Sequence, residues 1–338
     1  MAAVRQNDDA VYRPDPPAAD QRIAWPAEFG LRFALFVDTE EEFDWSRPFE
    51  RANRSTDAIV ALPMAHAMFA AAGLKPVYLV DHPIACDPRA VEVLRTLVEM
   101  GTADIGTQLH PWVNPPFAET LNVTNSFAGN LDATLEAAKL DTLHQAIVTA
   151  FGRAPVVYRA GRYGLGARTL GLLEARGYRV DTSMRSLYDY SADGGPDYSQ
   201  LDIAPFWCGP HGTLIELPLS STYTGVLRGT GRAISRLPGA GLLARTGLCS
   251  RVALTPEDMP VADVLDAIRA MVGDGVQLLS FSYHSPSLVP GHTPYVRDAA
   301  DLMTFYRWWD AVFDLLARLG ALPATLDDIV GAAWAGRG

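Results

Sequence analysis

Chemically active side chains follow short apolar runs at several places in this chain. Asp38 follows the run at 31–37, His284 follows the run at 276–283, and Arg159 ends a third run. A carboxylate and a histidine on opposite sides of a bound carbonyl group can act as general base and general acid. The pattern therefore favours hydrolysis of an amide or an ester. Asp38 would accept a proton from water, His284 would protonate the departing group, and Arg159 would orient Asp38 or bind an anionic part of the substrate.

Two further side chains are candidate metal ligands. Glu40 lies two residues after Asp38, and His110 follows the apolar run at 103–109. A divalent ion held by Glu40 and His110 would lower the pKa of a bound water molecule to about 7 and polarise a carbonyl group.

Other charged residues near these positions have plainer interpretations. We expect Glu41 and Glu42 to face solvent. Asp181 ends another apolar run and is either a loop cap or an ion-pair partner of Arg159. Arg162 is a second candidate for binding an anionic group.

The elements that must position these residues alternate along the chain. The predicted strands are 31–37, 75–80, 103–109, 155–159, 178–181, 213–219 and 276–283, and the predicted helices lie near 57–72, 88–100, 131–151, 166–176, 261–272, 298–319 and 325–335. Such alternation is typical of a parallel sheet covered by helices. We predict an α/β fold, a distorted (β/α)7 barrel, with the active residues at the carboxyl ends of its strands.

The chain shows no composition change that would separate two lobes. Residues 1–30 are acidic and rich in proline, which predicts a flexible N-terminal arm, and residues 31–338 are expected to form one domain. An irregular insertion is expected near 187–258, where glycines interrupt the pattern. Its aromatic and arginine side chains would either form a platform for a sugar or pack under an irregular lid; they are Tyr188, Tyr190, Tyr198, Trp207, Tyr223, Arg228 and Arg232.

Composition excludes several classes of protein. The formal net charge of -11 over 338 residues leaves no basic field for nucleic acid. Three widely spaced cysteines argue against a disulfide framework. No GxSxG or GxxxxGK[ST] motif occurs. Since we find no signal sequence and no stretch that would span a membrane, we expect a cytoplasmic protein.

Five segments resemble, in order, the motifs of the polysaccharide deacetylases with the NodB homology fold, and most of all a WalW-type subgroup. The segments are FVDTEEEFDW at 36–45, DIGTQLHPWVNPP at 104–116, YRAGRYG at 158–164, YRVDTS at 178–183 and LSFSYHSPSL at 279–288. The resemblance implies a distorted barrel and metal-dependent removal of acetyl groups from N-acetylated sugars. It also implies that Asp38 is the catalytic base, His284 the acid, Arg159 the support of the base, and Asp181 the acidic residue of the fourth motif.

The metal site departs from the pattern of that family. Thr39 stands where a metal-binding Asp is expected, so Glu40 is the substitute. Gln108 and Trp112 stand at the spacing of the usual histidine pair, which leaves His110 as the imidazole. We expect a divalent ion, with zinc as the first choice, although a Gln oxygen would weaken zinc binding or favour a harder metal.

The remaining expectations concern the substrate and the alternatives. Arg162, Tyr163, Gln108 and Trp112 are assigned to binding of a carbohydrate substrate. Asp81 or Asn114 would complete a rearranged metal site. If there is no such site, the chain is either a metal-free amidohydrolase of the same fold or an inactive carbohydrate-binding protein.

Overall fold

A computed structural model describes residues 11–44, 47–234 and 246–337, and it is built around one large curled sheet. The strands of this sheet are β1 (Arg32–Thr39), β2 (Val77–Val80), β3 (Asp104–Leu109), β4 (Val157–Ala160), β5 (Val180–Asp181), β6 (Phe206–Cys208), β7 (Leu214–Glu216), β10 (Leu278–His284) and β11 (Leu322–Pro323). Two further strands, β8 (Ser221–Thr224) and β9 (Ser250–Ala253), pair with each other in antiparallel fashion.

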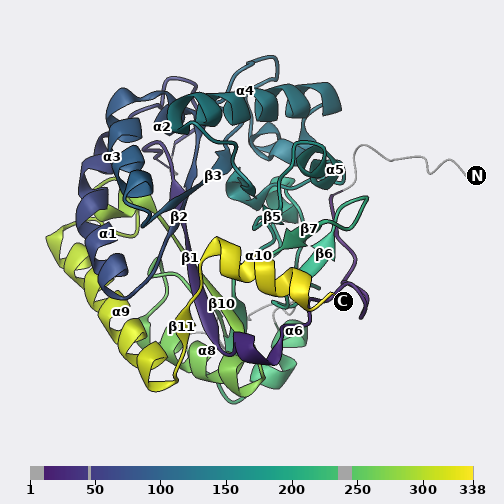
Figure 1. The fold of residues 1–338 in the computed structure, drawn as a ribbon, viewed down its shortest axis with the longest axis vertical. Helices are drawn as coiled ribbons and strands as arrows, with labels where there is room; N and C mark the ends of the chain where they lie inside the picture. Colours follow the sequence, from purple (N-terminus) through teal and green to yellow (C-terminus); the bar gives the residue numbers. More distant parts are fainter. Residues whose placement is uncertain (1–10, 45–46, 235–245, 338) are drawn as a thin grey trace, which may run out of the picture.

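The sheet has the strand order β10-β1-β2-β3-β4-β5-β7-β6, and only β6 runs antiparallel to its neighbour along this path. The seven parallel strands along this path are those expected from the sequence, so the predicted (β/α)7 architecture is confirmed, and β11 adds a short parallel pairing with β1. The sheet curls into a half-barrel (Figure 1). Between β7 and β10 the gap is bridged by Ser220 and Leu254, since Ser280 N donates to the side-chain Oγ of Ser220 at 2.9 Å and Ser282 N donates to the backbone oxygen of Leu254 at 3.1 Å.

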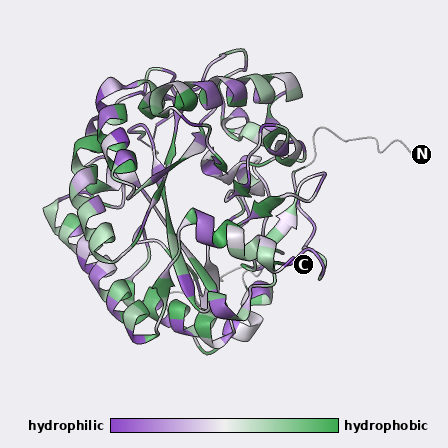
Figure 2. Ribbon diagram, viewed as in Figure 1, coloured by the Kyte–Doolittle hydropathy of each residue, from purple (hydrophilic) through white to green (hydrophobic). Residues whose placement is uncertain are grey.

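Helices surround the outer face of the sheet (Figure 1). The helices of the described residues are α1 (Leu62–Ala71), α2 (His82–Cys86), α3 (Pro88–Glu99), α4 (Ala133–Phe151), α5 (Thr169–Glu174), α6 (Gly231–Ile234), α8 (Val261–Gly273), α9 (Ala299–Arg318) and α10 (Leu326–Ala335), of which α10 packs on the inner face instead. The hydrophobic colour concentrates in the central strands, whereas the outer helices alternate between polar and apolar residues (Figure 2). Among the described residues, none of these helices combines the length and apolar character needed to cross a bilayer.

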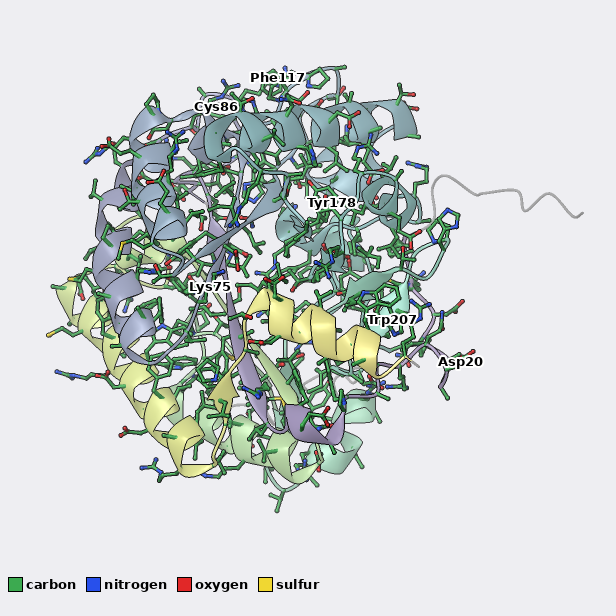
Figure 3. The ribbon with its side chains drawn as sticks, in the orientation of Figure 1. Asp20, Lys75, Cys86, Phe117, Tyr178 and Trp207 are labelled. Carbon is green, nitrogen blue, oxygen red and sulfur yellow. The ribbon has the colours of Figure 1, made fainter. Side chains whose placement is uncertain are left out.

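The inner face of the half-barrel is apolar at one end and polar at the other. Alternate residues of a strand face the same side, so Ala34 and Phe36 of β1 point inward on the same side as Asp38. The apolar inner layer consists of Ala34, Phe36, Val77, Leu79, Val157, Val180, Ile215 and Leu278 together with Ile329 and Val330 of α10. Helix α10 lies across this end (Figure 1), and Trp207 of β6 lies beside it (Figure 3). Trp334 of α10 packs on Trp207 at 4.7 Å between ring centroids. The carboxyl ends of the strands therefore carry the polar side chains at the opposite end.

The N-terminal arm (1–30) and the insertion near 187–258 were both expected to be irregular. Their described residues contact the sheet or form part of it. Backbone groups of residues 21 and 23 bond to the chain around β6: Trp207 N donates to Gln21 O at 2.8 Å, and Ile23 N donates to Pro205 O at 3.0 Å. Residues 1–10 of the predicted arm and 235–245 of the predicted insertion lie outside the described residues. The remainder of the insertion contributes β6, β7, β8, α6 and β9.

Truncation of Ile329 tests the role of α10 as the apolar closure. Ile329 has no exposed surface, so Ile329→Ala leaves a cavity and should lower the free energy of unfolding by about 2–5 kcal/mol. Met303→Ala in α9, whose side chain is 52% exposed, is the control and should change it by less than about 0.5 kcal/mol. Urea unfolding followed by circular dichroism measures both. Equal effects of the two substitutions would contradict this packing.

Candidate active site

Asp38 ends β1 in an ion pair with Arg159 of β4. Arg159 Nη1 donates to Asp38 Oδ1 and, at 2.7 Å, to Ser282 Oγ. The other side of the guanidinium donates to Thr182, through Nε to the carbonyl oxygen and through Nη2 to Oγ1, both at 3.1 Å. Asp38 is only 2% exposed, and Arg159 is fully buried. The guanidinium thus holds Oδ1 of the carboxylate, and Oδ2 is the oxygen that does not bond to Arg159.

His284 ends the neighbouring strand β10, and in the parallel pairing of β1 with β10 it stands opposite Asp38. Its Nε2 is 3.5 Å from Asp38 Oδ2. Its Nδ1 lies 2.6 Å from Glu257 Oε2, and its backbone N donates to Glu257 Oε1 at 3.0 Å. Burial lowers the pKa of His284, but the charges of Glu257, Glu40 and Asp38 outweigh it and raise the pKa to about 10. His284 therefore carries a proton at neutral pH.

Glu257 was missed by the sequence analysis. It lies in the loop between β9 and α8, away from the end of any predicted strand, and no sequence pattern marks it. Ser287 Oγ also donates to Glu257 Oε1, at 2.5 Å. Ser282, also missed, lies two residues before His284 on one strand, so the two-residue period of a strand would have identified it.

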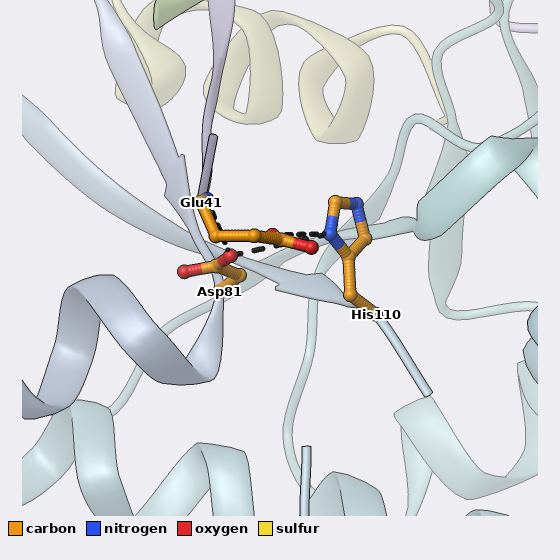
Figure 4. Close-up of side chains that lie close together, drawn as sticks. All are labelled: Glu41, Asp81 and His110. Atoms are coloured by element: carbon orange, nitrogen blue, oxygen red, sulfur yellow. Dashed lines mark hydrogen bonds and ion pairs between the residues drawn. The ribbon is translucent and has the colours of Figure 1, made fainter. Parts of the chain in front are cut away.

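A second histidine and carboxylate pair lies beside the first. His110 Nδ1 is 2.8 Å from Glu41 Oε2, and Trp112 Nε1 donates to Glu41 Oε1 at 2.7 Å. The backbone N of Glu41 donates to Asp81 Oδ2 at 2.8 Å. Figure 4 shows Glu41, Asp81 and His110 pointing toward one another. Burial is the main cause that raises the pKa of Glu41 to about 8 and that of Asp81 well above its usual range.

The expectation that Glu41 and Glu42 face solvent is wrong. Glu41 has no exposed surface, and the side chain of Glu42 is only 12% exposed and contacts Ser55 and His292. The reason is that the chain turns inward after β1, where the backbone N of Glu41 bonds to Asp81 at the end of β2. A run of acidic residues in a sequence does not reveal such a turn.

Glu41, Asp81 and His110 form a buried group whose ligand atoms all lie within 4.8 Å of one another, close enough to hold a metal ion. His110 was predicted as a ligand, and Asp81 was considered as one. Glu40, the other predicted ligand, lies on the far side of the imidazole, where its Oε2 is 3.4 Å from His110 Nε2. Burial, acting against the charges of His284 and His110, raises the pKa of Glu40 to about 7.

Most of the predicted site residues surround one cavity of about 230 Å³. Its lining includes Asp38, Glu40, Gln108, His110, Arg159, Arg162, Tyr163, Arg185, Tyr190, His284 and Tyr295. Within this lining, Glu40 Oε2 and Gln108 Oε1 are buried and have no hydrogen-bond partner among the residues that the structure describes. Unpaired buried oxygens are costly, so these two atoms together with His110 Nε2 suit a cation at the cavity wall.

Two predicted site residues lie behind the cavity. Trp112 has no exposed surface, and its ring stacks on the ring of His110 at 4.3 Å between centroids. Asp181 is also fully buried, where Ser183 Oγ donates to its Oδ1 at 2.5 Å. Burial raises the pKa of Asp181 to about 6, and burial and the charge of Asp181 raise the pKa of Glu216 well above its usual range. Of the two partners considered for Arg159, Asp38 is the one it pairs with.

The loop after β4 brings its backbone against His110. A Cβ atom at Gly161 would collide with the ring of His110 and with Leu109 O, so only glycine fits there. Arg162 and Tyr163 follow with φ values of 54° and 60°, which are unfavourable for residues other than glycine. Such strain is often found at functional sites, and here it turns both side chains toward the cavity.

The fold of this chain is shared with solved structures of low sequence identity. No protein-family model and no curated protein sequence matches the chain. Among solved structures, it is similar to a candidate polysaccharide deacetylase from Mycobacterium smegmatis, with 17% identity over 95% of each chain and a TM-score of 0.55. It is also similar to Puue allantoinase, with 14% identity over 95% of this chain and 94% of the other and a TM-score of 0.53. At these identities the likeness establishes a shared fold.

Replacement of Glu257 tests the charge state of His284. In Glu257→Gln the imidazole loses its nearest negative charge, so the pKa of His284 should fall below its present value of about 10. Because that pKa is raised in the folded state, the protonated imidazole stabilises the protein fully below about pH 6.5, its unfolded pKa, and this stabilisation is lost as the pH rises through about 10. In Glu257→Gln the free energy of unfolding should therefore fall less steeply as the pH rises.

The measurement is the NMR titration of the His284 ring, combined with unfolding at a series of pH values. Glu92→Gln on the exposed face of α3 is the control and should leave the titration unchanged. An unchanged midpoint in Glu257→Gln would show that this carboxylate does not hold the proton on His284.

Proposed function

We propose that the protein is a hydrolase that removes the acetyl group from an N-acetylated sugar or glycan. The observation that carries this proposal is the placement of Asp38 and His284, 3.5 Å apart on adjacent strands, at the wall of one cavity. Each has a buried partner of opposite charge, Arg159 for Asp38 and Glu257 for His284. The fold shared with a candidate polysaccharide deacetylase supports the choice of substrate class.

Asp38 acts as the general base in this proposal. Arg159 holds Oδ1, so Oδ2 is the oxygen that accepts the proton of the attacking water. The hydrogen bonds from Arg159 to Thr182 and Ser282 stop the guanidinium from moving into the cavity. Arg159 is therefore a positioning residue.

His284 acts as the general acid. Because its pKa is raised to about 10, its Nε2 carries a proton at neutral pH that can pass to the departing amine. The bond between Nδ1 and Glu257 fixes the orientation of the ring. Base and acid thus approach the same amide from neighbouring strands.

The residues at the cavity wall fit a divalent metal ion. Glu40, His110 and Gln108 would hold it, because Glu40 Oε2 and Gln108 Oε1 are buried without hydrogen-bond partners among the described residues and His110 Nε2 lies 3.4 Å from Glu40 Oε2. When bound, such an ion polarises the carbonyl group and activates water. Glu41 would then orient His110 through Nδ1, which is the usual arrangement behind a histidine ligand. Zinc is our first choice, and an oxygen-rich set also accepts harder ions.

A metal-free amidohydrolase is the second candidate. It is supported by the fold shared with Puue allantoinase and by the hydrogen bonds of Glu41, which are complete without an ion. In both candidates we assign Arg162 and Tyr163 of the cavity lining to substrate binding, and in the metal-free candidate Gln108, which then holds no ion, joins them. Trp112, which was also assigned to substrate binding, would act indirectly, by holding the ring of His110 on which it stacks. Membership of the WalW-type subgroup and a cytoplasmic location remain predictions.

Removal of the base is the first test. Acetate release from N-acetylglucosamine oligomers should be detectable with the purified protein and should fall by a factor of about 10²–10⁴ in Asp38→Asn. Asp274→Asn, which breaks an exposed ion pair with Arg228, is the control and should retain full activity. Full activity of Asp38→Asn would remove the proposed base. If the natural protein binds these oligomers but releases no acetate, the inactive carbohydrate-binding alternative is favoured.

Metal removal decides between the two candidate hydrolases. The purified protein should contain about one equivalent of a divalent ion by elemental analysis, and His110→Ala should lower that content, because it removes the imidazole ligand. A chelator should abolish acetate release, and added zinc or manganese should restore it. Turnover that persists in metal-free protein would contradict the metal site and favour the metal-free amidohydrolase.

A further inference from the structure

One basic side chain at the cavity has no role in the chemistry described above. Arg185, which follows β5, lines the cavity that contains Asp38 and His284. It also lines a second cavity of about 210 Å³. The two cavities share the side chains of Tyr163, Arg185, His284 and Tyr295 as walls. Arg185 therefore lies where a substrate that extends beyond the reacting amide would pass.

Aromatic rings hold the guanidinium of Arg185 in place. Its Cζ lies 3.9 Å from the ring centroid of Tyr188 and 5.3 Å from that of Tyr163. Tyr190 stacks on Tyr163 at 5.7 Å between centroids, and Arg251 also stacks on Tyr188, at 3.8 Å. These contacts orient the planar group and partly remove it from water, but they do not neutralise its charge.

No carboxylate of the described residues lies within 4.0 Å of Arg185, unlike the other two arginines of the cavity. Arg159 pairs with Asp38, and Arg162 pairs with Asp193 at 3.1 Å. The one hydrogen bond of the Arg185 guanidinium in the described part of the chain is a long one of 3.5 Å to the hydroxyl of Tyr190. The Nε of Arg185 is buried and finds no hydrogen-bond partner in residues 11–44, 47–234 and 246–337.

The acidic residues of the second cavity do not pair with this charge. Glu257 is held by His284 and Ser287, and Asp258 lies beyond ion-pair distance of Arg185. A desolvated guanidinium with an unused donor gains free energy when an anion supplies the missing acceptors. Its fork of N–H groups matches the two oxygens of a carboxylate, a phosphate or a sulfate.

We propose that Arg185, held between Tyr163 and Tyr188, binds an anionic group of the substrate and makes the site selective for acidic sugars. The choice of a sugar rests on the proposed function. The anion-binding role rests on the unpaired charge of Arg185 at the wall shared by the two cavities. Arg162 is not the residue that selects the anion, because Asp193 already neutralises it.

Equilibrium binding tests this without requiring turnover. Isothermal titration calorimetry compares N-acetylglucosamine with its uronic acid, its 6-phosphate and its 6-sulfate. The natural protein should bind at least one acidic sugar about tenfold or more tightly than the neutral sugar, and the ranking of the three identifies the anion. Arg185→Gln should abolish that preference, and Arg185→Lys should keep part of it.

Arg269→Gln is the matched control, because it removes an exposed arginine of α8 that pairs with Asp266 at 2.8 Å. It should leave the preference for acidic sugars unchanged. Thermal unfolding checks that Arg185→Gln is folded; if it is not, the natural protein and Arg185→Lys still decide the matter.

Equal affinity for neutral and acidic sugars, no binding of any acidic sugar, or an unchanged preference in a folded Arg185→Gln would each overturn the anion site. Failure of acetate release together with a preference for acidic sugars that depends on Arg185 would refute the proposed reaction and leave the anion site standing. The two proposals therefore fail separately.

Discussion

The buried ion pair between Asp38 and Arg159 is the interaction on which the site depends. Burial of a carboxylate that is only 2% exposed is costly without a partner of opposite charge. Arg159 supplies the opposite charge, and its other hydrogen bonds go to Thr182 and Ser282, so the guanidinium is held from several sides. These bonds join the ends of β1, β4, β5 and β10. Because breaking one partner of such a pair is costly, the position of each strand end constrains the others.

The half-barrel separates stability from chemistry along the strands. Phe36 and Val157 belong to the apolar layer that α10 closes, and two residues further on the same faces carry Asp38 and Arg159. The two-residue period of a strand makes this possible, since it keeps one face pointing inward over the whole length. Apolar packing at one end holds the strands, and the polar groups at the other end need only satisfy one another and the substrate.

Two histidines of the site use carboxylates in different ways. Glu257 keeps His284 protonated, because it lies 2.6 Å from Nδ1 and its pKa is lowered by the charge of His284 despite burial, so it stays ionised. Glu41 lies 2.8 Å from His110 Nδ1, but burial raises its pKa to about 8 and it shares its oxygens with Trp112. The first arrangement suits an acid, and the second suits a ring that presents Nε2 to a ligand.

The sequence by itself determined the seven parallel strands and the strand-end positions of Asp38, His284 and Arg159, because strand and helix periodicity and local turn residues are properties of neighbouring positions. Only the tertiary structure decided that Glu41 is buried, that Glu257 from a distant loop holds His284, and that Arg185 faces the cavity with no carboxylate of the described residues paired to it. These facts depend on how loops fold back over the strand ends. Such contacts join residues far apart in the chain, and no local pattern encodes them.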